Sequence, residues 1–308
     1  MASTPEISVA IILVNWNGYA YTQACLESLE KVKEPAFQVI LVDNGSQNSE
    51  GEQLKARFPH VHLIANQGNL GFAGGNNVGI RYALEQGFEQ VLLLNNDTLV
   101  DPYFLKPLQT ELRASKYGVV QPLICFAQDS KTLWSAGGKW NSLLGRAITL
   151  GDRVPLENYS PPKSLELDWA TGCCMLLSKE AILTAGLLNE QYFAYFEDVE
   201  WSLRIRKSGF KIGLSENSII YHEAGAASKK QHSEGTLSPK VFYYHVRNQL
   251  FLLRQHSLVL GYPYHLLRFS SWGAYFLIRG RFQKLSAVWQ GIREGLFTPL
   301  NSEKKWLQ

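Results

Sequence analysis

The first hundred residues alternate short apolar runs with segments whose apolar positions recur at helical spacing. The apolar runs predict strands and are Ser8–Val14, Phe37–Val42, Val61–Ala65 and Val91–Leu94. Two intervening segments, Tyr21–Val32 and Asn76–Gln86, predict helices. This alternation is typical of parallel βαβ units, in which ligands bind beyond the carboxyl ends of the strands.

Small polar residues follow each of these four strands. They are Asn15-Trp16-Asn17-Gly18, Asp43-Asn44-Gly45-Ser46, Asn66–Asn77 and Asn95-Asn96-Asp97. A turn would explain any one of these segments, because Asn and Gly tolerate positive φ. Four such segments on one edge of one sheet indicate instead a crevice lined by polar groups.

The second half of the chain is less regular. Residues 115–165 predict only loops and short strands. Further on, the pattern predicts a buried strand Asp168–Leu177, helices Lys179–Ala185 and Glu197–Lys207, short strands Lys211–Leu214 and Ser218–Tyr221, and a polar loop Ser228–Ser238.

The C-terminal residues are basic and amphipathic. Residues 241–308 hold nine Lys and Arg against two acidic residues, whereas residues 1–240 hold 21 against 25. One helical face would carry Tyr243, Val246, Leu250 and Leu253, and another Leu285, Val288, Trp289, Ile292 and Leu296. These helices could pack on the body or lie in an anionic lipid interface. We therefore divide the chain into a domain of residues 1–240 and a helical extension of residues 241–308.

Composition narrows the class of protein. With 308 residues, 45% apolar and 19% charged, the chain can bury a full core. Met1–Glu6 lacks the basic start of a signal peptide, and the charge-free stretches around Arg268 are shorter than the roughly 18 residues of a spanning helix. We expect a cytoplasmic protein, with peripheral contact at the inner face of the membrane. The four cysteines lack C-x-x-C spacing and are expected to be buried thiols.

Two residues could bind a divalent cation. Asp97 follows a predicted strand, where its carboxylate could hold Mg²⁺ or Mn²⁺ together with a diphosphate, although it could also cap the turn toward Pro102. His222 ends another predicted strand, and a neutral imidazole can ligate such ions. A lone histidine is more often a satisfied structural group.

The segment Gly68–Asn77 is a glycine-rich loop that runs into a predicted helix. Gly71, Gly74 and Gly75 allow close backbone approach, and a helix beginning near Asn76 would offer free N–H groups to an anion. The spacing matches neither G-x-G-x-x-G nor a Walker motif. Dinucleotide and P-loop chemistry therefore lose support.

Three acidic residues stand at a predicted helix start in Tyr195–Trp201. Asp and Glu favour the first helical turn for structural reasons alone. The same helix field would lower the pKa of a carboxylate there and keep it ionised, which suits a general base.

Taken in order, these motifs resemble the family 2 inverting glycosyltransferases, in their rhamnosyltransferase-like branch. The resemblance spans about residues 7–225 and is carried by Val14–Gly18, Val42–Ser46, Asn69–Asn77, Leu94–Thr98, Gly172–Leu176, Phe196–Asp198 and His222. It implies a GT-A fold, an α/β nucleotide-diphospho-sugar transferase fold with a Rossmann-like mixed sheet flanked by helices.

The resemblance also implies roles for single residues. Asp43 would contact the base or ribose, Asp97 the metal and the donor diphosphate, Asp198 would be the catalytic base, and His222 a second metal ligand. Other nucleotide-sugar contacts would come from Asn15, Asn17, Gly45, Asn69, Gly71, Gly75, Asn76, Asn95 and Asn96, and acceptor-side contacts from Trp169, Gly172 and Glu197. Asn95 replaces the first acid of the Asp-x-Asp found in many relatives, which leaves one charge fewer for Mn²⁺ or Mg²⁺.

The expected donor is dTDP-rhamnose, with a UDP-hexose second, and the expected acceptor is a glycan or polyprenyl-linked glycan of surface polysaccharide synthesis; no nucleic acid is expected. Two alternatives stay open. A sugar-1-phosphate nucleotidyltransferase would need a basic loop after the first strand, where Asn15–Tyr19 has no Lys or Arg. A non-catalytic nucleotide-sugar or glycan-binding module would bind donor without consuming it.

Overall fold

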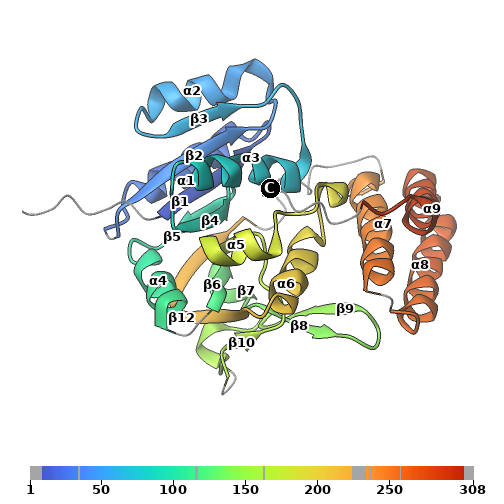
Figure 1. Cartoon of the computed structure of the whole chain (residues 1–308). Coiled ribbons are helices and arrows are strands. Elements are labelled where there is room, and N and C mark those ends of the chain that lie inside the picture. The colour runs from blue at the N-terminus through green and yellow to red at the C-terminus, as the bar shows by residue number, and fades with distance from the viewer. Residues whose placement is uncertain are drawn as a thin grey trace, which may run out of the picture.

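The structure, a computed structural model, describes residues 9–33, 35–114, 117–161, 164–223, 234–235, 237–256 and 258–301. In this part of the chain a mixed ten-stranded sheet forms the body, and three C-terminal helices stand beside it (Figure 1). Across the same residues, every helix is too short or too polar to span a bilayer.

The N-terminal half is a parallel sheet in the spatial order β3-β2-β1-β4. Its strands are β1 (Val9–Asn15), β2 (Phe37–Asp43), β3 (His62–Ala65) and β4 (Gln90–Asn95), and its crossover helices are α1 (Tyr19–Leu29), α2 (Glu50–Arg57) and α3 (Gly71–Glu85). A short 3₁₀ turn, η1 (Gln47–Ser49), precedes α2. The predicted βαβ organisation and its four strands are confirmed.

Both faces of this sheet are buried, which explains why its strands are continuously apolar. In β1, Ala10 and Ile12 belong to one core cluster with Ala73 and Ile80 of α3. The alternate residues of β1 belong to a second cluster on the other face, which includes Leu26 of α1. Side chains alternate across a strand, so two apolar faces require an unbroken apolar run.

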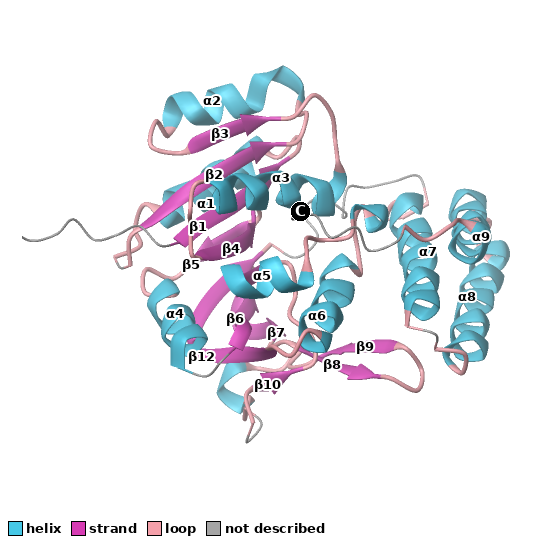
Figure 2. Ribbon diagram, in the orientation of Figure 1, coloured by secondary structure: helices cyan, strands magenta, loops and turns pink. Residues whose placement is uncertain are grey.

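The second half extends the sheet through an antiparallel strand. β11 (Cys174–Ser178) pairs with β4 and with β6 (Tyr117–Phe126), and β12 (Lys211–His222) runs parallel to β6. The remaining elements are β5 (Thr98–Val100), α4 (Leu105–Ala114), β7 (Asp129–Ser135), the hairpin β8 (Gly138–Asn141) and β9 (Arg146–Thr149), η2 (Leu156–Asn158), β10 (Glu166–Leu167), α5 (Lys179–Ala185), η3 (Glu190–Tyr192) and α6 (Glu197–Lys207). Figure 2 shows helices on both sides of the strands.

Three predictions for this half are wrong in detail. Residues 117–126, expected to be loop and short strand, form a ten-residue strand in the sheet. The expected strand Asp168–Leu177 begins only at Cys174. The two short strands after Lys211 are one strand, β12, because the polar residues after Ser215 form a register shift rather than a turn.

The helices α7 (Pro239–Gln255), α8 (Gly261–Ile278) and α9 (Phe282–Phe297) form their own apolar cluster. The predicted face of α7 is confirmed, since Val246, Leu250 and Leu253 are buried there. On the second predicted face, Val288 is buried in the same cluster, whereas Trp289 is 66% exposed. Most of the predicted loop Ser228–Ser238, and residues 302–308 of the predicted extension, lie outside the described residues.

Candidate active site

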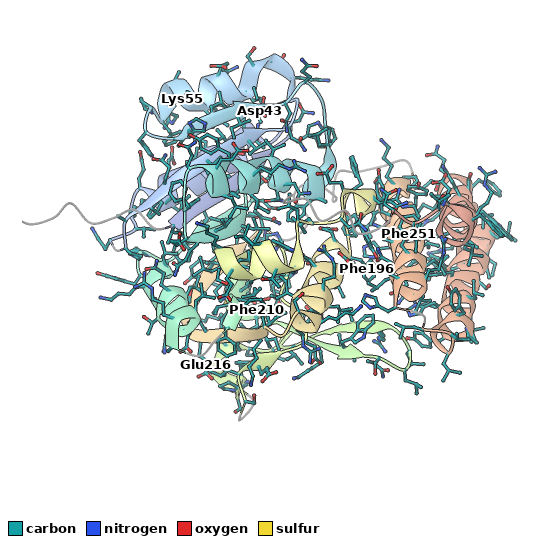
Figure 3. The ribbon with its side chains drawn as sticks, viewed as in Figure 1. Asp43, Lys55, Phe196, Phe210, Glu216 and Phe251 are labelled. Carbon is teal, nitrogen blue, oxygen red and sulfur yellow. The ribbon has the colours of Figure 1, made fainter. Side chains whose placement is uncertain are left out.

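The polar ends of three parallel strands are neighbours at one edge of the sheet. Asn15 is in register with Asp43 of β2, and the adjacent Val14 is in register with Asn95 of β4. Figure 3 shows Asp43 in this half of the sheet and Phe196 where α6 meets α7. The edge predicted from sequence is therefore a continuous polar rim.

Asn15 holds this rim together from within. Its buried Nδ2 donates to Asp43 Oδ1 at 3.2 Å and to Ser46 Oγ and Glu50 Oε2, both at 3.0 Å. Its Oδ1 accepts from Thr22 Oγ1 at 2.7 Å. Both ends of the amide are thus bonded inside the protein, so Asn15 positions Asp43.

Asn17 and Asn96 lie on the same rim and are also fixed. The Asn17 backbone N–H donates to Ser46 Oγ at 3.0 Å, and Asn17 Oδ1 accepts from the Gln47 N–H at 2.8 Å. Asn96 Nδ2 donates to Thr22 Oγ1 at 2.8 Å. The loops after β1, β2 and β4 are therefore linked to one another by side chains.

Asn44 was not among the predicted site residues, yet it organises the glycine-rich segment. Its buried Nδ2 donates to Asn69 Oδ1 at 3.1 Å and to the Gly71 carbonyl at 3.0 Å. Its Oδ1 accepts from the Leu70 N–H at 3.1 Å. The neighbouring Gly45 has a φ of +75° and packs on the Gly68 backbone, where a Cβ would lie 2.6 Å from Gly68 Cα.

The predicted anion site at the start of the next helix is wrong. Helix α3 begins at Gly71 rather than near Asn76, and its first N–H groups are not free. The N–H groups of Phe72 and Ala73 donate to the Phe193 carbonyl at 2.7 and 3.2 Å. Inside this helix, Asn76 Nδ2 donates to the Phe72 carbonyl at 2.9 Å.

Its glycines serve packing. A Cβ on Gly75 would lie 2.8 Å from Val14 Cγ1 of β1, so only glycine lets α3 come this close to the sheet. A Cβ on Gly71, whose φ is +75°, would lie 2.5 Å from the Phe193 carbonyl oxygen. The segment shapes the rim without offering a free helix end.

The predicted pair Asp97 and His222 is brought together. His222 is in register with Thr98 on the antiparallel strands β12 and β5, which places it beside Asp97. His222 Nε2 lies 3.2 Å from Asp97 Oδ1, and the two side chains are 7% and 13% exposed. Trp134 packs edge-on against the imidazole, with 4.5 Å between the ring centroids.

These two residues fit part of a metal shell. Among the residues that the structure describes, neither Asp97 Oδ1 nor His222 Nδ1 has a hydrogen-bond partner, although both are buried. The atoms that face each other are Asp97 Oδ1 and His222 Nε2, and their separation of 3.2 Å is close to the roughly 3 Å between adjacent ligands of an ion about 2.1 Å away. The described residues contain no cluster of three or more potential ligands, so other oxygens would have to complete the shell.

Glu197 and Asp198 begin helix α6, as predicted. Asp198 Oδ2 accepts from the Gly172 N–H at 3.0 Å, and its Oδ1 accepts from the Val199 N–H at 2.8 Å. Glu197 is buried, and its Oε2 lacks a hydrogen-bond partner among the described residues. Only Asp198 of this pair retains a partly exposed side chain.

The prediction that the helix field lowers the pKa of this carboxylate is wrong. Burial raises the pKa of Asp198 above its ordinary value, and the hydrogen bonds from Gly172 and Val199 offset part of the rise. Burial, with the neighbouring Asp198 charge, raises the pKa of Glu197 well above its ordinary value. Desolvation therefore outweighs the hydrogen bonds that favour the ionised form of Asp198.

The turn 171–173 connects Asp198 to Asp97 and its neighbour His222. The Gly172 N–H donates to Asp198, and the next carbonyl, of Cys173, accepts from the Asn95 N–H at 2.8 Å, two residues before Asp97. Burial raises the pKa of the Cys173 thiol well above its ordinary value, with contributions from the nearby Asp97 and Asp198 carboxylates. Both acids therefore lie close to one turn.

The lack of a side chain at Gly172 also lets Phe72, from the glycine-rich segment, approach Asp198. A Cβ on Gly172 would lie 2.8 Å from Phe72 Cζ and 3.6 Å from Asp198 Cβ. Residues from α3, the turn and α6 thus meet at one point. The four cysteines, as expected, are buried and unpaired with one another.

Trp169, predicted as an acceptor-side residue, is almost entirely buried. Trp169 is 7% exposed, its Nε1 donates to the Lys139 carbonyl, and it clusters with Val199 and Leu252. A cavity of about 610 Å³ lies elsewhere, lined by residues that include Tyr103, Thr110 and Asn217; none of the predicted site residues lines it.

The strands follow the order β3-β2-β1-β4, the antiparallel β11 continues the sheet, and a polar rim with Asp97 lies after β4. Together these features define the GT-A class of glycosyltransferase folds. Residues 10–182 match the family described as Glycosyl transferase family 2. The chain belongs to this family.

Three curated relatives show where the similarity lies. The low-salt glycan biosynthesis hexosyltransferase Agl10 of Haloferax volcanii is 29% identical over 67% of this chain and 64% of its own length. The dTDP-rhamnosyl transferase RfbF of Shigella flexneri is 27% identical over 75% of this chain and 76% of its own length. N-acetylglucosaminyl-diphospho-decaprenol L-rhamnosyltransferase of Mycobacterium tuberculosis is 23% identical over 80% and 84%. The chain therefore spans less than two thirds of the Haloferax relative.

Solved structures show the same fold at low sequence identity. Mannosyltransferase PcManGT from Pyrobaculum calidifontis, solved with GDP-Man and Mn²⁺, has a TM-score of 0.57 at 12% identity, over 96% of this chain and 91% of its own. S. aureus TarS 1-349 has a TM-score of 0.56 at 16% identity, over 94% of this chain and 82% of its own. GalNAc-T7 with UDP, GalNAc and Mn²⁺ reaches 0.59 at 16% identity, over 80% and 48%.

Proposed function

We propose that this chain transfers a sugar, with inversion at the anomeric carbon, from a nucleotide diphosphate donor to a glycan acceptor. One observation carries the proposal: the turn 171–173 joins Asp198 to the end of β4, where Asp97 lies beside His222 of β12. A base and a cation site beside one turn suit attack at a carbon whose leaving group is a diphosphate.

Asp198 is the base of this reaction. The acceptor hydroxyl gives its proton to Asp198, and its oxygen forms a bond to the anomeric carbon. The bond from that carbon to the diphosphate oxygen breaks, and the nucleoside diphosphate leaves with the electron pair. The raised pKa of Asp198 suits this role, because a base works best when its pKa is close to the working pH.

Asp97 and His222 would hold a divalent cation, Mn²⁺ or Mg²⁺, together with the donor diphosphate. Such an ion, when bound, would neutralise charge that develops on the leaving diphosphate. Mn²⁺ is named for two of the similar structures, each with a nucleotide or nucleotide sugar. Asn95 in place of an acid makes the protein ligand set less negative, so the diphosphate would supply most of the ligand oxygens.

The donor side is formed by the rim. Asp43, held by Asn15, would contact the base or ribose, with Gly45, Asn69 and Asn96 around the sugar and diphosphate. Two of the relatives are named as rhamnosyltransferases, one of them for dTDP-rhamnose. We therefore favour dTDP-rhamnose as donor and place a UDP-hexose second.

The acceptor would approach at Gly172 and Glu197, beside Asp198. The mycobacterial relative is named for an acceptor on diphospho-decaprenol. We propose a polyprenyl-linked glycan here as well, reached by an enzyme at the cytoplasmic face of the membrane. Peripheral contact would then be made by the outer helices α8 and α9.

The experiment on Asp198 tests the proposal directly. Asp198→Asn should lower the transfer rate by about 10²–10⁴-fold, because the amide cannot accept the hydroxyl proton. Donor binding, followed by thermal shift, should stay close to that of the wild type. Asp152→Asn, at an exposed loop, is the control and should transfer normally. Unchanged turnover in Asp198→Asn would remove Asp198 from the base role.

A donor screen tests the cation site and the sugar together. Nucleotide sugars are compared by thermal shift with Mn²⁺, with Mg²⁺ and with a chelator. We expect the largest shift with dTDP-rhamnose and metal, and its loss in Asp97→Asn and His222→Ala. A shift that survives chelation and both substitutions would overturn the cation site.

A further inference from the structure

The segment that leads into the base is strained. Phe193, Tyr195 and Phe196 have φ values of 64°, 71° and 70°, in the left-handed region that side chains rarely adopt. None of the three is a glycine, and each such residue costs of order 1–3 kcal/mol unless its surroundings hold it. Glu197 and Asp198 follow directly, so this backbone sets the position of the base.

Asn248 of α7 holds the segment by its carbonyls. Its Nδ2 lies 2.9, 2.7 and 2.8 Å from the carbonyl oxygens of Tyr192, Ala194 and Tyr195. Asn248 is fully buried, so these bonds form away from water. The two N–H groups of one side-chain amide thus reach three carbonyls within four residues, one N–H being shared, and this convergence depends on the strained shape of the segment.

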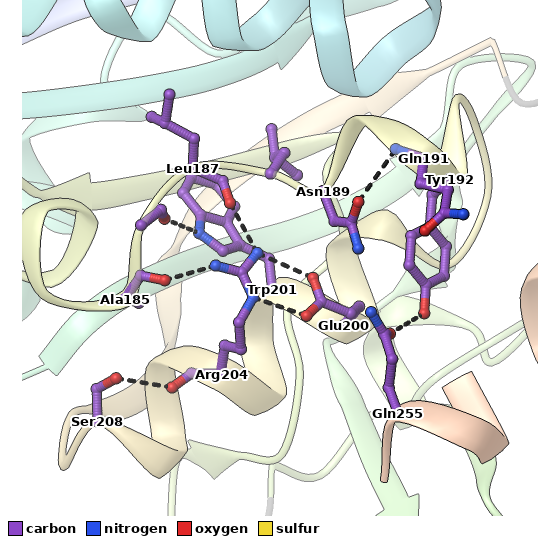
Figure 4. Close-up of polar contacts among 12 residues, drawn as sticks. Ala185, Leu187, Asn189, Gln191, Tyr192, Glu200, Trp201, Arg204, Ser208 and Gln255 are labelled. Atoms are coloured by element: carbon purple, nitrogen blue, oxygen red, sulfur yellow. Dashed lines mark hydrogen bonds and ion pairs between the residues drawn. The ribbon is translucent and has the colours of Figure 1, made fainter. Parts of the chain in front are cut away.

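Arg247 adds a second set of bonds to the same backbone. The Arg247 Nη2 donates to the Gln191 and Tyr192 carbonyls at 2.9 and 2.8 Å, and the Arg247 Nε donates to Asn248 Oδ1 at 2.8 Å. The bond to Oδ1 orients the Asn248 amide so that Nδ2 faces the carbonyls. Figure 4 shows a further link, from the Tyr192 hydroxyl to Gln255 near the end of α7.

Aromatic contacts follow the same path. The rings of Phe193 and Tyr244 stack with centroids 5.2 Å apart. His245 contacts the rings of Tyr195 and Phe196, with centroids 4.5 and 5.6 Å apart. Tyr244 and His245 therefore contact all three residues of the strained segment that have positive φ.

We propose that Asn248 and Arg247 are positioning residues for the transfer reaction, which hold the strained segment so that Asp198 stays at the acceptor hydroxyl. The inference rests on the proposed role of Asp198 as base. Helix α7 is then part of the catalytic machinery, although residues 241–308 look like a separate extension in the sequence.

The test compares neighbouring buried amides on α7. Asn248→Asp keeps the shape of the side chain but replaces its N–H donors by a carboxylate oxygen, which repels the three carbonyls. This variant should lower kcat on the order of 10²-fold, with a smaller change in the KM for the donor. Arg247→Lys, a partly buried site, is the second variant if Asn248→Asp does not fold. The matched control is Gln249→Met, since Gln249 is equally buried and donates to the Gly145 carbonyl outside this segment.

A double-mutant cycle with Asp198→Asn decides whether Asn248 acts through the base. If it does, the double variant transfers no more slowly than Asp198→Asn alone. Independent, multiplying losses, or wild-type kcat in Asn248→Asp and Arg247→Lys, would overturn the positioning role while leaving the Asp198 result intact. Normal turnover in Asp198→Asn would instead reject the proposed base.

Discussion

At the scale of single residues, one carbonyl oxygen determines why Gly71 must be glycine. The Phe193 carbonyl accepts from two N–H groups at the start of α3, and a Cβ on Gly71 would lie 2.5 Å from it. Gly71→Ala should lower the free energy of unfolding by more than the roughly 1–2 kcal/mol of a left-handed alanine, because it also forces this carbonyl away.

Gly68→Ala is the matched control for Gly71→Ala. No atom lies within 4 Å of a Cβ at Gly68, so stability should change little. Chemical denaturation of the two variants measures the difference. Equal losses at both positions would show that the close contact with Phe193 does not matter.

The buried carboxyl of Glu197 makes stability depend on pH. Burial raises its pKa well above the ordinary value, whereas in the unfolded chain it titrates near about 4.3. The native state therefore binds this proton more tightly, and the stability that it contributes is complete below about pH 4 and lost as pH rises through the native pKa.

Glu197→Gln removes this titration. The melting temperature of the variant minus that of the wild type should rise between pH 4 and pH 8. The reason is that the wild type loses the stability contributed by the Glu197 proton over this range, whereas the variant has no such proton to lose. Differential scanning calorimetry across this range checks the prediction. A difference that does not change with pH would mean that Glu197 is ionised in the native protein.

Only some of the site residues could be found from the sequence. Asp97, Asp198 and His222 have side chains suited to metal or proton chemistry and stand at the ends of predicted elements. Asn44 and Asn248 hold other segments in place by donating to backbone carbonyls far away in sequence. The sequence around an asparagine in a loop or helix does not indicate which distant carbonyl it will bond.

At the scale of elements, the buried ion pair of α6 fixes the loop before it. Arg204 donates to the Glu200 carboxylate through Nε at 2.6 Å and through Nη2 at 2.9 Å, and it also donates to the carbonyls of Ala185 and Leu187 (Figure 4). The side chains are 11% and 3% exposed. Arg204→Met should cost roughly 3–5 kcal/mol of unfolding free energy, because it leaves Glu200 buried without its partner.

The exposed pair of Arg57 and Glu27 is the comparison for this prediction. Its side chains are 52% and 41% exposed, so Arg57→Met should lower the free energy of unfolding far less than Arg204→Met. Urea denaturation of both variants gives the two values. A loss in Arg204→Met as small as that in Arg57→Met would contradict the role of the buried pair.

The sequence predicted those elements whose pattern is local. The strands β1 to β4 were found because both faces of the sheet are apolar. The start of α3 was misplaced because its capping carbonyl comes from Phe193, more than a hundred residues later, and helix α8 was not predicted at all. In β12, the register shift after Ser215 resembles a turn in sequence but keeps the strand in the sheet.

At the scale of the whole molecule, the outer helices α8 and α9 expose several large apolar side chains. Figure 1 shows α7 next to the body and these two helices beyond it. Exposed apolar side chains on them are Leu267, Leu277, Ile278, Phe282, Trp289 and Phe297. Between residues 237 and 301 the only acidic residue in the sequence is Glu294, and it accepts from Tyr243. Such a surface, with Arg279, Arg281 and Arg293 beside it, suits an anionic lipid interface.

Vesicle binding tests this surface. The protein should co-sediment with vesicles that contain anionic lipid and much less with neutral ones, and Leu267→Glu should weaken that binding. Leu183→Glu on α5 makes the same change at an exposed leucine of the body and should bind as the wild type does. Equal binding by both variants would remove α8 from the proposed contact.

The hydrogen bonds between α7 and the strained segment restrict how this protein can be recombined with its relatives. Consider a chimaera that joins the first 238 residues of this protein to the terminal helices of another family member. The carbonyls of residues 191–195 would come from one parent, and the side chains at positions 247 and 248 that must bond to them would come from the other. Such a hybrid could be well folded and still inactive. Productive exchanges would have to transfer residues 191–198 and the helix that holds them as one inseparable block.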